Sequence, residues 1–405
     1  MPESVMVAYQ DFVALCQSSD SEARGQAAHM AARAYLCHEG PADEHAALYA
    51  ALIGFLDDPS VKVRAALAYG LLHATNAPRP VLLALLQDSA VIARAVAQYS
   101  PALVDADLIG LIRSGDAAIL LAIALRERVS PRVALALIGR GERGVTLKLL
   151  SRREIGIAED ALTRLAEGPG LEDAELRGAL LARGDLPAGA RLLLVEHVAA
   201  LLGGLRVVKG AIAPQRLERL MRDLTDSAAT SIGEATAGEG TAYADTLIAR
   251  QRISIRVLLH AVVNGHVMFF ADCIAALGEM PRSKVFGLLE RGSRTAIAAM
   301  LGRCGLEPEV SALLARLVLM AREADLADDV AARHFVVTAL TEEILIEHCN
   351  AVPAALEEAF SYLSEQNVGL ALKAARGVMA GFAGHRGGDA LPLPSGEMRL
   401  ALSAA

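Results

Sequence analysis

The chain of 405 residues contains no tryptophan, and aromatic residues make up only 4% of it. Alanine and leucine are abundant instead, and this composition favours closely packed helices over β-sheets. Apolar residues make up 54% of the chain, which is enough for a large core. The composition therefore predicts an all-α fold.

Cysteine is scarce as well. The five cysteines are Cys16, Cys37, Cys273, Cys304 and Cys349. They are odd in number and widely spaced, without a CxxC pair, so they predict neither a disulfide framework nor a zinc site. We expect reduced core residues in a cytoplasmic protein.

The sequence has no basic domain. Its formal net charge is −8, and both halves of the chain carry more acidic than basic residues. Phosphate neutralisation supplies most of the affinity of general nucleic-acid binding. A nucleic-acid partner is therefore not expected.

Targeting signals are also missing. Residues 1–18 lack the basic start and the apolar run of a signal peptide. The closest approach to a membrane span is Val257–Gly278, but its His260 and Asp272 are costly at bilayer depth. We expect a buried helical hairpin that turns at Gly265, and no membrane contact.

Motifs for catalysis are missing too: the sequence has no nucleophile motif, glycine-rich phosphate loop or HExxH. His260 and His266, with Cys273, lack the paired spacing of a structural zinc site and are predicted to be core or surface residues. Glu343 and Glu347 share one face of an expected helix, which is typical of a solvated surface. We expect no enzyme activity, no metal and no cofactor.

The chain does contain an internal repeat. The segments Leu52–Leu72 and Leu82–Ser100 align at a spacing of thirty residues. In each copy an apolar run ends at a turn, and an aspartate is expected to cap the second helix, with Pro59 in its first position. One helix pair cannot bury its apolar stripe alone, so the repeat predicts a solenoid of stacked pairs. The identical pairs are Leu52 and Leu82, Leu56 and Leu86, Asp58 and Asp88, Val61 and Val91, Arg64 and Arg94, Ala65 and Ala95, and Tyr69 and Tyr99.

The turn at residues 56–59, LDDP, followed by VRAA at residues 63–66, resembles a HEAT repeat. In such repeats the turn aspartate and a helix arginine often form a ladder between neighbouring units. The resemblance therefore implies a ladder that involves Asp58, Asp88, Arg64 and Arg94.

A shorter pattern recurs at residues 111–116, 137–142 and 180–185. Each copy predicts the end of a helix, a glycine in the left-handed conformation and an acid that opens the next helix. The predicted domains are a HEAT-like helical repeat domain at 1–204, a connecting helix and hinge at 205–242, a second α-helical domain at 243–380, and a disordered tail at 381–405.

The arrangement of the whole chain is similar to an alphaproteobacterial group, domain-of-unknown-function family 2336. The resemblance rests on LDDPSVKVRAALA at 56–68, YSPAL at 99–103, RGDLP at 183–187 and the block at 265–277 with its two phenylalanines. It implies a HEAT-like N-terminal half joined to a second helical domain. It also implies an interaction module in bacterial signal transduction.

Positive charge is concentrated at residues 126–153, where Glu127 and Glu142 are the only acids. On a solenoid such side chains can line one surface, so they are candidate contacts for an anionic partner. The alternative is a set of arginines that are solvated or paired within the chain. The basic residues are Arg126, Arg128, Arg132, Arg140, Arg143, Lys148, Arg152 and Arg153.

The leading functional hypothesis is a non-enzymatic protein-interaction scaffold or regulatory adaptor, with a protein partner and with homo-oligomers left open. The alternative is a small-molecule or nucleotide sensor whose pocket lies between Val257–Gly278 and Ala331–Cys349. A further alternative is a DNA-binding enzyme, because a few HEAT-like folds are DNA glycosylases. The absence of tryptophan argues against it.

Overall fold

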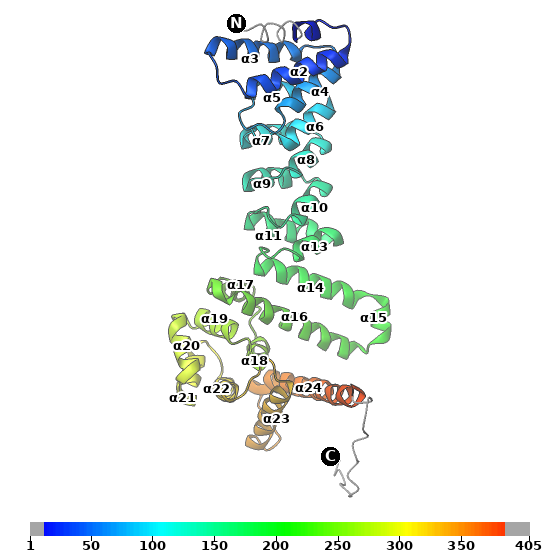
Figure 1. Cartoon of the computed structure of the whole chain (residues 1–405). Helices are drawn as coiled ribbons and strands as arrows, with labels where there is room; N and C mark the ends of the chain where they lie inside the picture. Colours follow the sequence, from blue (N-terminus) through cyan, green and yellow to red (C-terminus); the bar gives the residue numbers. More distant parts are fainter. Residues whose placement is uncertain (1–11, 385–405) are drawn as a thin grey trace. The chain divides into compact units, whose positions relative to one another are not determined.

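A computed structural model of the chain describes residues 12–384 (Figure 1). This part of the chain is helical and contains no β-strand. Contacts between the helices divide the chain into two compact units, Met1–Leu194 and Val195–Ala405. The prediction of an all-α fold is confirmed.

The first unit is a stack of helix pairs. Its helices are α2 (Ser21–Leu36), α3 (Ala42–Leu56), α4 (Val61–Leu71), α5 (Arg79–Leu85), α6 (Ala90–Tyr99), α7 (Asp105–Ser114), α8 (Ala117–Ala124), α9 (Pro131–Gly139), α10 (Arg143–Ser151), α11 (Glu159–Glu167), α12 (Pro169–Glu172) and α13 (Ala174–Leu181). Helices α4, α6, α8, α10 and α13 contact one another in chain order, and α2 packs on α4 (Figure 1). Each also contacts the first helix of its own pair, α3, α5, α7, α9 or α11. Serial neighbours therefore cover the apolar stripes, as predicted.

The stack has one continuous core. Its buried apolar side chains form a single cluster that extends from Ala27 to Leu194. Within α4, Val63, Leu67 and Leu71 fall on one helical face and are fully buried. Burial of such side chains is the main favourable term in folding, so each pair depends on its neighbours for stability.

The turn aspartates do not occupy the predicted cap position. Helix α4 begins at Val61 with Ser60 as its N-cap, and Asp58 Oδ1 accepts a hydrogen bond from Ser60 N at 2.8 Å. Pro59 therefore lies in the turn and not in the first position of the helix. Asp88 likewise precedes Ser89, the N-cap of α6.

The shorter repeat pattern is followed in part. Asp116 opens α8 as predicted, since its Oδ1 accepts a hydrogen bond from Ile119 N at 2.9 Å. Gly141 adopts the predicted left-handed conformation with φ 71°. Gly115 does not, because its φ is −72° and the chain leaves α7 in an extended conformation.

The second unit begins inside a helix. The boundary at Leu194–Val195 falls within α14, before residue 204, where the sequence placed it. The predicted connecting segment at 205–242 is helical for most of its length, because α16 continues through the Ser- and Ala-rich stretch to Thr236, and the chain breaks at Gly240, with φ 97°, inside the predicted hinge. The helices that follow the stack are α14 (Ala188–Gly204), α15 (Arg206–Ala211), α16 (Pro214–Thr236), η1 (Ala237–Glu239), α17 (Ala242–Ala249), α18 (Ile255–Val263), α19 (Val267–Leu277), α20 (Arg282–Arg291), α21 (Arg294–Arg303), α22 (Pro308–Glu323), α23 (Val330–Glu347), η2 (Ala354–Leu356) and α24 (Glu357–Gly384).

The predicted buried hairpin is formed by α18 and α19. Its turn is at Gly265, where φ is 76° and a Cβ atom would lie 2.8 Å from the backbone of Ala327. Glycine is required there both for the left-handed conformation and for this close approach. Within residues 12–384 no helix is long and apolar enough to span a bilayer. Of the predicted disordered tail, residues 381–384 belong to α24 and residues 385–405 lie outside the described part.

Candidate functional site

Arg126, the first residue of the candidate anionic-partner surface, is buried. It follows α8 and is 8% exposed. Its guanidinium donates to the carbonyl oxygens of Ala97 at 2.5 Å and Ser100 at 2.7 Å, at the end of α6. The last carbonyls of a helix have no partner within that helix, and the helix dipole favours a cation there. Burial lowers the pKa of Arg126, and the prediction of a surface contact is wrong for this residue.

Two other predicted contacts act in the same way. Arg140, at the end of α9, donates to Ile112 O and Arg113 O, at the end of α7, at 2.6 and 2.7 Å. Arg152, at the end of α10, donates to Ala124 O and Arg126 O, at the end of α8, at 2.8 and 2.6 Å. These donors cap the helix of the preceding pair and are not directed toward a partner.

The same pattern continues where the sequence did not indicate a site. Arg183, which follows α13, is 1% exposed and donates to carbonyls at the end of α10, among them Ile155 O at 2.8 Å and Arg152 O at 3.2 Å. Arg183, Arg152 and Arg126 therefore form a series in which each guanidinium reaches the end of the helix one pair earlier. The recurrence of arginine just after a second helix is the sequence signal for this series.

The remaining arginine candidates are exposed, and Lys148 is half-buried. Arg143 forms ion pairs with Asp173 and Glu175, and this guanidinium lowers the pKa of Asp173 to about 2. Arg128, Arg132 and Arg153 form no ion pair or hydrogen bond with any residue of the described range. The arginines of this run therefore differ in environment, and only these three present free guanidinium groups.

A different surface of the stack exposes apolar side chains on successive helices. Helices α2, α4, α6 and α8 expose aromatic and aliphatic side chains, with Tyr69 69%, Val91 67% and Tyr99 50% exposed. Each tyrosine lies against a histidine of the preceding helix or loop: His29 and Tyr69 are 5.6 Å apart between ring centres, and His73 and Tyr99 are 5.8 Å apart. Tyrosine is enriched in protein interfaces because one side chain offers apolar area and a polar hydroxyl group.

This surface has two hollows. One lies between α2 and α4, has a volume of about 640 Å³ and includes Gln26, Lys62 and Tyr69 in its lining. The other lies between α6 and α8, has a volume of about 360 Å³ and includes Arg94, Tyr99 and Leu121. We refer to the exposed surface of α2, α4, α6 and α8 as the tyrosine face.

Arg94 is the charged group of the second hollow. Arg64, its counterpart in the preceding copy, pairs with Asp88, and Arg24 pairs with Asp58 in the same manner. Arg94 has no such partner in the described part of the chain; its Nε donates only to Ala90 O, at 2.9 Å. The implied ladder therefore includes Arg24, which the sequence did not indicate, and ends before Arg94.

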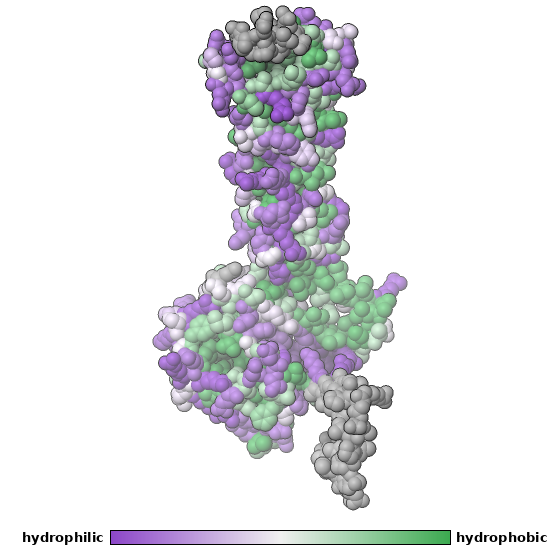
Figure 2. All heavy atoms as spheres, viewed as in Figure 1, coloured by the Kyte–Doolittle hydropathy of each residue, from purple (hydrophilic) through white to green (hydrophobic). Residues whose placement is uncertain are grey.

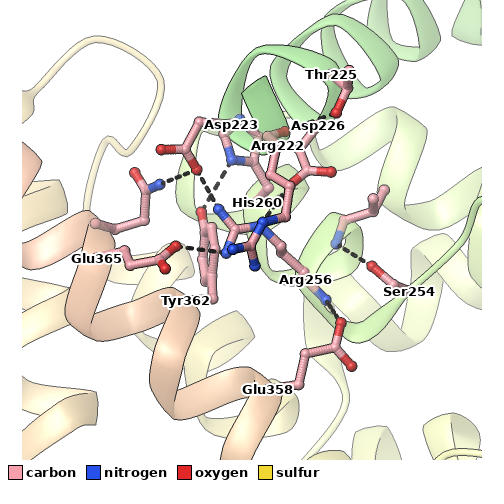
Figure 3. A network of polar contacts seen from close by, with 12 residues as sticks. Arg222, Asp223, Thr225, Asp226, Ser254, Arg256, His260, Glu358, Tyr362 and Glu365 are labelled. Carbon is pink, nitrogen blue, oxygen red and sulfur yellow. Dashed lines mark hydrogen bonds and ion pairs between the residues drawn. The ribbon is translucent and has the colours of Figure 1, made fainter. Parts of the chain in front are cut away.

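The second unit contains a buried cluster of charges around Arg256 of α18 (Figure 3). Arg256 Nε donates to Asp226 Oδ2 at 2.6 Å, Nη1 donates to Glu365 Oε2 at 2.7 Å, and Nη2 donates to Asp223. The guanidinium also lies 5.1 Å from the ring centre of Tyr362. One cation thus joins α16, α18 and α24, and the three carboxylates leave the cluster with a net negative charge.

The pKa values in this cluster show the effect of burial. Desolvation raises the pKa of Asp223 and of Asp226, although the ion pairs with Arg256 act in the opposite direction. The ion pairs raise the pKa of Arg256 itself against its desolvation. Every carboxylate faces the same guanidinium, which fixes three helices together.

His260 is the core histidine that the sequence predicted as one alternative. It is 6% exposed, and its Nδ1 lies 3.2 Å from Tyr362 Oη (Figure 3). Burial lowers its pKa to about 4, so the ring is neutral at pH 7. His266 is the N-cap of α19, and Cys273 is buried in the same helix. In the described residues no three ligand-type side chains are grouped so that they could hold a metal ion.

The two glutamates of α23 and the cysteines can also be compared with their predicted positions. Glu343 pairs with Arg316 at 3.4 Å, and Glu347 is exposed on the same helix. Of the cysteines, Cys273 is buried as predicted, but Cys37 and Cys349 are exposed, so the expectation of core residues is wrong for these two.

The cavity beside the α18–α19 hairpin lies elsewhere than predicted. Its volume is about 260 Å³, and its lining includes Val262, Phe270, Phe286 and Val318, which belong to α18, α19, α20 and α22. Helix α23, the predicted wall, does not contribute to it. The volume is below the range of about 300–1,000 Å³ that is typical of ligand pockets.

Comparison with known proteins gives a family and no activity. A family model described as an uncharacterised protein conserved in bacteria, DUF2336, matches residues 92–347. A search of the curated proteins found no match. The matched segment covers more than half of the chain and includes helices of both units. The chain therefore belongs to the DUF2336 family.

Proposed function

We propose that this chain is a non-enzymatic adaptor that binds another protein through the tyrosine face. The observation that supports this proposal is the row of exposed apolar and aromatic side chains, Tyr69, Val91, Tyr99 and Leu121, on successive helices of the stack. Soluble proteins that expose such side chains along a continuous surface commonly use that surface for binding.

The chemistry of the face defines the partner segment. Its hollows lie between neighbouring helices of the stack, which suits a helix or an extended segment with apolar side chains. The first hollow is lined by both Lys62 and Glu22, whereas Arg94 is the charged group of the second hollow and has no carboxylate partner within the described residues. The partner is therefore a protein segment with apolar residues and at least one carboxylate, in a cytoplasmic complex that serves signal transduction.

Photo-crosslinking in the native cell tests this proposal. A photoreactive residue is placed at Tyr69, at Tyr99 or, as the control, at Val104. Val104 is 50% exposed like Tyr99 but precedes α7 and is outside the face. We expect one protein to be crosslinked from both tyrosine positions and not from Val104, and the substitution Arg94→Glu to abolish the product at Tyr99. No product at either tyrosine, or the same products at all three positions, would contradict the proposal.

A further inference from the structure

A second surface has a different character. In the second unit, residues 200–224, which cover the end of α14, all of α15 and the start of α16, contain no buried residue. Figure 2 shows apolar side chains gathered over these helices. Helices α14 and α16, joined by α15, form a second helical hairpin, and we call residues 200–224 its hairpin tip. Its exposed large apolar residues are Leu201, Leu202, Leu205, Val207, Leu220 and Leu224, and Val207 is 81% exposed.

The apolar residues of α16 follow the spacing of a helix-packing seam. Leu217, Leu220, Met221 and Leu224 are separated by three or four positions and so lie on one face of the helix. Between α14 and α16 lies a hollow with a volume of about 530 Å³, and its lining includes Gly203, Leu217 and Met221. Both helices therefore offer apolar side chains, and the space between them is open.

The base of the α14–α16 hairpin, outside residues 200–224, is fixed by ion pairs to other helices of the second unit, and the tip has no buried residue. Glu196 of α14 pairs with Arg252, and Asp226 of α16 pairs with Arg256. Most helical stability in proteins comes from packing of an apolar face and not from intrinsic propensity. Two helices whose apolar residues remain in water lack that contribution, so the tip requires a covering surface.

We propose that a second copy of this chain covers the tip, so that two hairpins form an antiparallel four-helix bundle about a twofold axis. Four helices with apolar stripes enclose a common core, which two helices cannot. Most homo-oligomers are symmetric dimers in which the same patch meets itself. The hairpin tip also has the length of about 20–30 residues that each partner contributes to an interface of ordinary size.

The distribution of charge along α16 favours a second copy of the chain and an antiparallel arrangement of the two α16 helices. The tip half carries Arg216, Arg219 and Arg222 against Glu218. The other half of α16, from residue 223 onward, carries Asp223, Asp226 and Glu234, and the Arg256 cluster is net negative. An antiparallel copy places the basic half of one α16 beside the acidic half of the other, so opposite charges meet at both ends of the seam.

The mass of the full-length protein in solution, measured by light scattering after gel filtration at micromolar concentration, tests the inference. We expect twice the 42.5 kDa of one chain. The substitution Leu220→Glu places a charge in the seam and is expected to weaken dimerisation at least about tenfold. The matched control is Ile346→Glu on α23, where the side chain is 77% exposed and outside the tip, and this variant is expected to remain dimeric.

A second variant tests the direction of pairing. Arg216→Glu combined with Arg219→Glu reverses the charge of the tip half, and we expect it to weaken the dimer more at low salt than at high salt. The circular dichroism spectrum of each variant should lose at most the contribution of the tip helices, because the substituted side chains are exposed and the rest of the fold does not depend on them.

Three results would overturn the inference: a monomeric unmodified chain, a dimer that Leu220→Glu leaves intact, or a monomer that sediments with anionic phospholipid vesicles through the same leucines. The adaptor proposal is tested separately, because the crosslinking positions Tyr69 and Tyr99 belong to the first unit and the hairpin tip belongs to the second. A monomer that still crosslinks a partner there contradicts the dimer alone, and a dimer without such a product contradicts the adaptor alone.

Discussion

Arg64 donates two hydrogen bonds to Asp88 of the next helix pair, from Nε to Oδ2 at 2.6 Å and from Nη2 to Oδ1 at 2.9 Å. Arg64 Nη1 also donates to Asp58 O at 2.6 Å, so a single guanidinium spans two turns of the stack. A two-point pair in this geometry is stronger than a single contact and fixes the orientation of both groups. It complements the apolar core by holding neighbouring pairs in register.

We predict a measurable coupling between Arg64 and Asp88. Alanine substitutions, made singly and together, should give a coupling free energy of about 1–2 kcal/mol, because both side chains are mostly buried. Chemical denaturation followed by circular dichroism measures it. The control pair is Arg291 and Glu290, both largely exposed, whose coupling should be about zero. Equal couplings for the two pairs would contradict a structural role for the ladder.

The second prediction concerns Arg126. Replacement by leucine leaves the carbonyl groups of Ala97 and Ser100 without their donor, and an unsatisfied buried polar group costs about 1–3 kcal/mol. Arg126→Leu should therefore destabilise the first unit by about 2–4 kcal/mol. Arg128→Leu, two residues away, removes the same charge from an exposed position and should change the stability by less than about 0.5 kcal/mol. Thermal unfolding of the two variants compares them directly, and equal midpoints would contradict the capping role.

The sequence predicted the stack well because its signals are local. Identical residues recur at a fixed spacing in two copies, and the apolar stripe of α4 lies within one short helix. It did not predict how the arginines after the second helices are used, since their acceptors are backbone carbonyls one pair earlier, and a carbonyl leaves no mark in the sequence. Charge counting alone therefore suggested a surface where Arg126 is in fact buried.

The Arg256 cluster was missed for a related reason. Arg256 lies 30 residues from Asp226 and 109 residues from Glu365, so no local pattern joins the three. The available signal was a single arginine within the apolar helix IRVLLHAVV, because a charge in such a helix requires partners. The tip of the α14–α16 hairpin was likewise not indicated, since an apolar stripe predicts burial without naming what buries it.

The third prediction concerns Arg256. Arg256→Met removes the cation and leaves three carboxylates facing one another, and the loss of one partner from a buried ion pair costs about 3–5 kcal/mol. Hydrogen exchange of α16, α18 and α24 should accelerate together, while exchange in the first unit should not change. Arg291→Met is the control, because Arg291 is 82% exposed and its ion pair is with the exposed Glu290. Faster exchange confined to α18 would contradict the role of Arg256 in joining three helices.

The fourth prediction is a pH dependence that arises from His260. Its pKa is about 4 in the folded chain, below the ordinary value of 6.5, because burial disfavours the charged ring. Between these values the unfolded chain binds a proton that the folded chain does not bind. The free energy of unfolding should therefore fall as the pH is lowered from 6.5 to 4, by about 3 kcal/mol over the full range.

The carboxylates of the Arg256 cluster have the opposite effect on the pH dependence of stability. A variant of His260 is therefore needed to isolate the contribution of the histidine. The pKa values of Asp223 and Asp226 are raised in the folded chain, so their protonation on acidification favours the folded state. His260→Gln removes the titrating ring and keeps a hydrogen-bonding group for Tyr362 Oη. Hydrogen exchange of α18, measured at pH 6.5 and at pH 4.5, should show a smaller loss of protection in this variant than in the unmodified chain. An identical loss in both proteins would show that the proton is bound elsewhere.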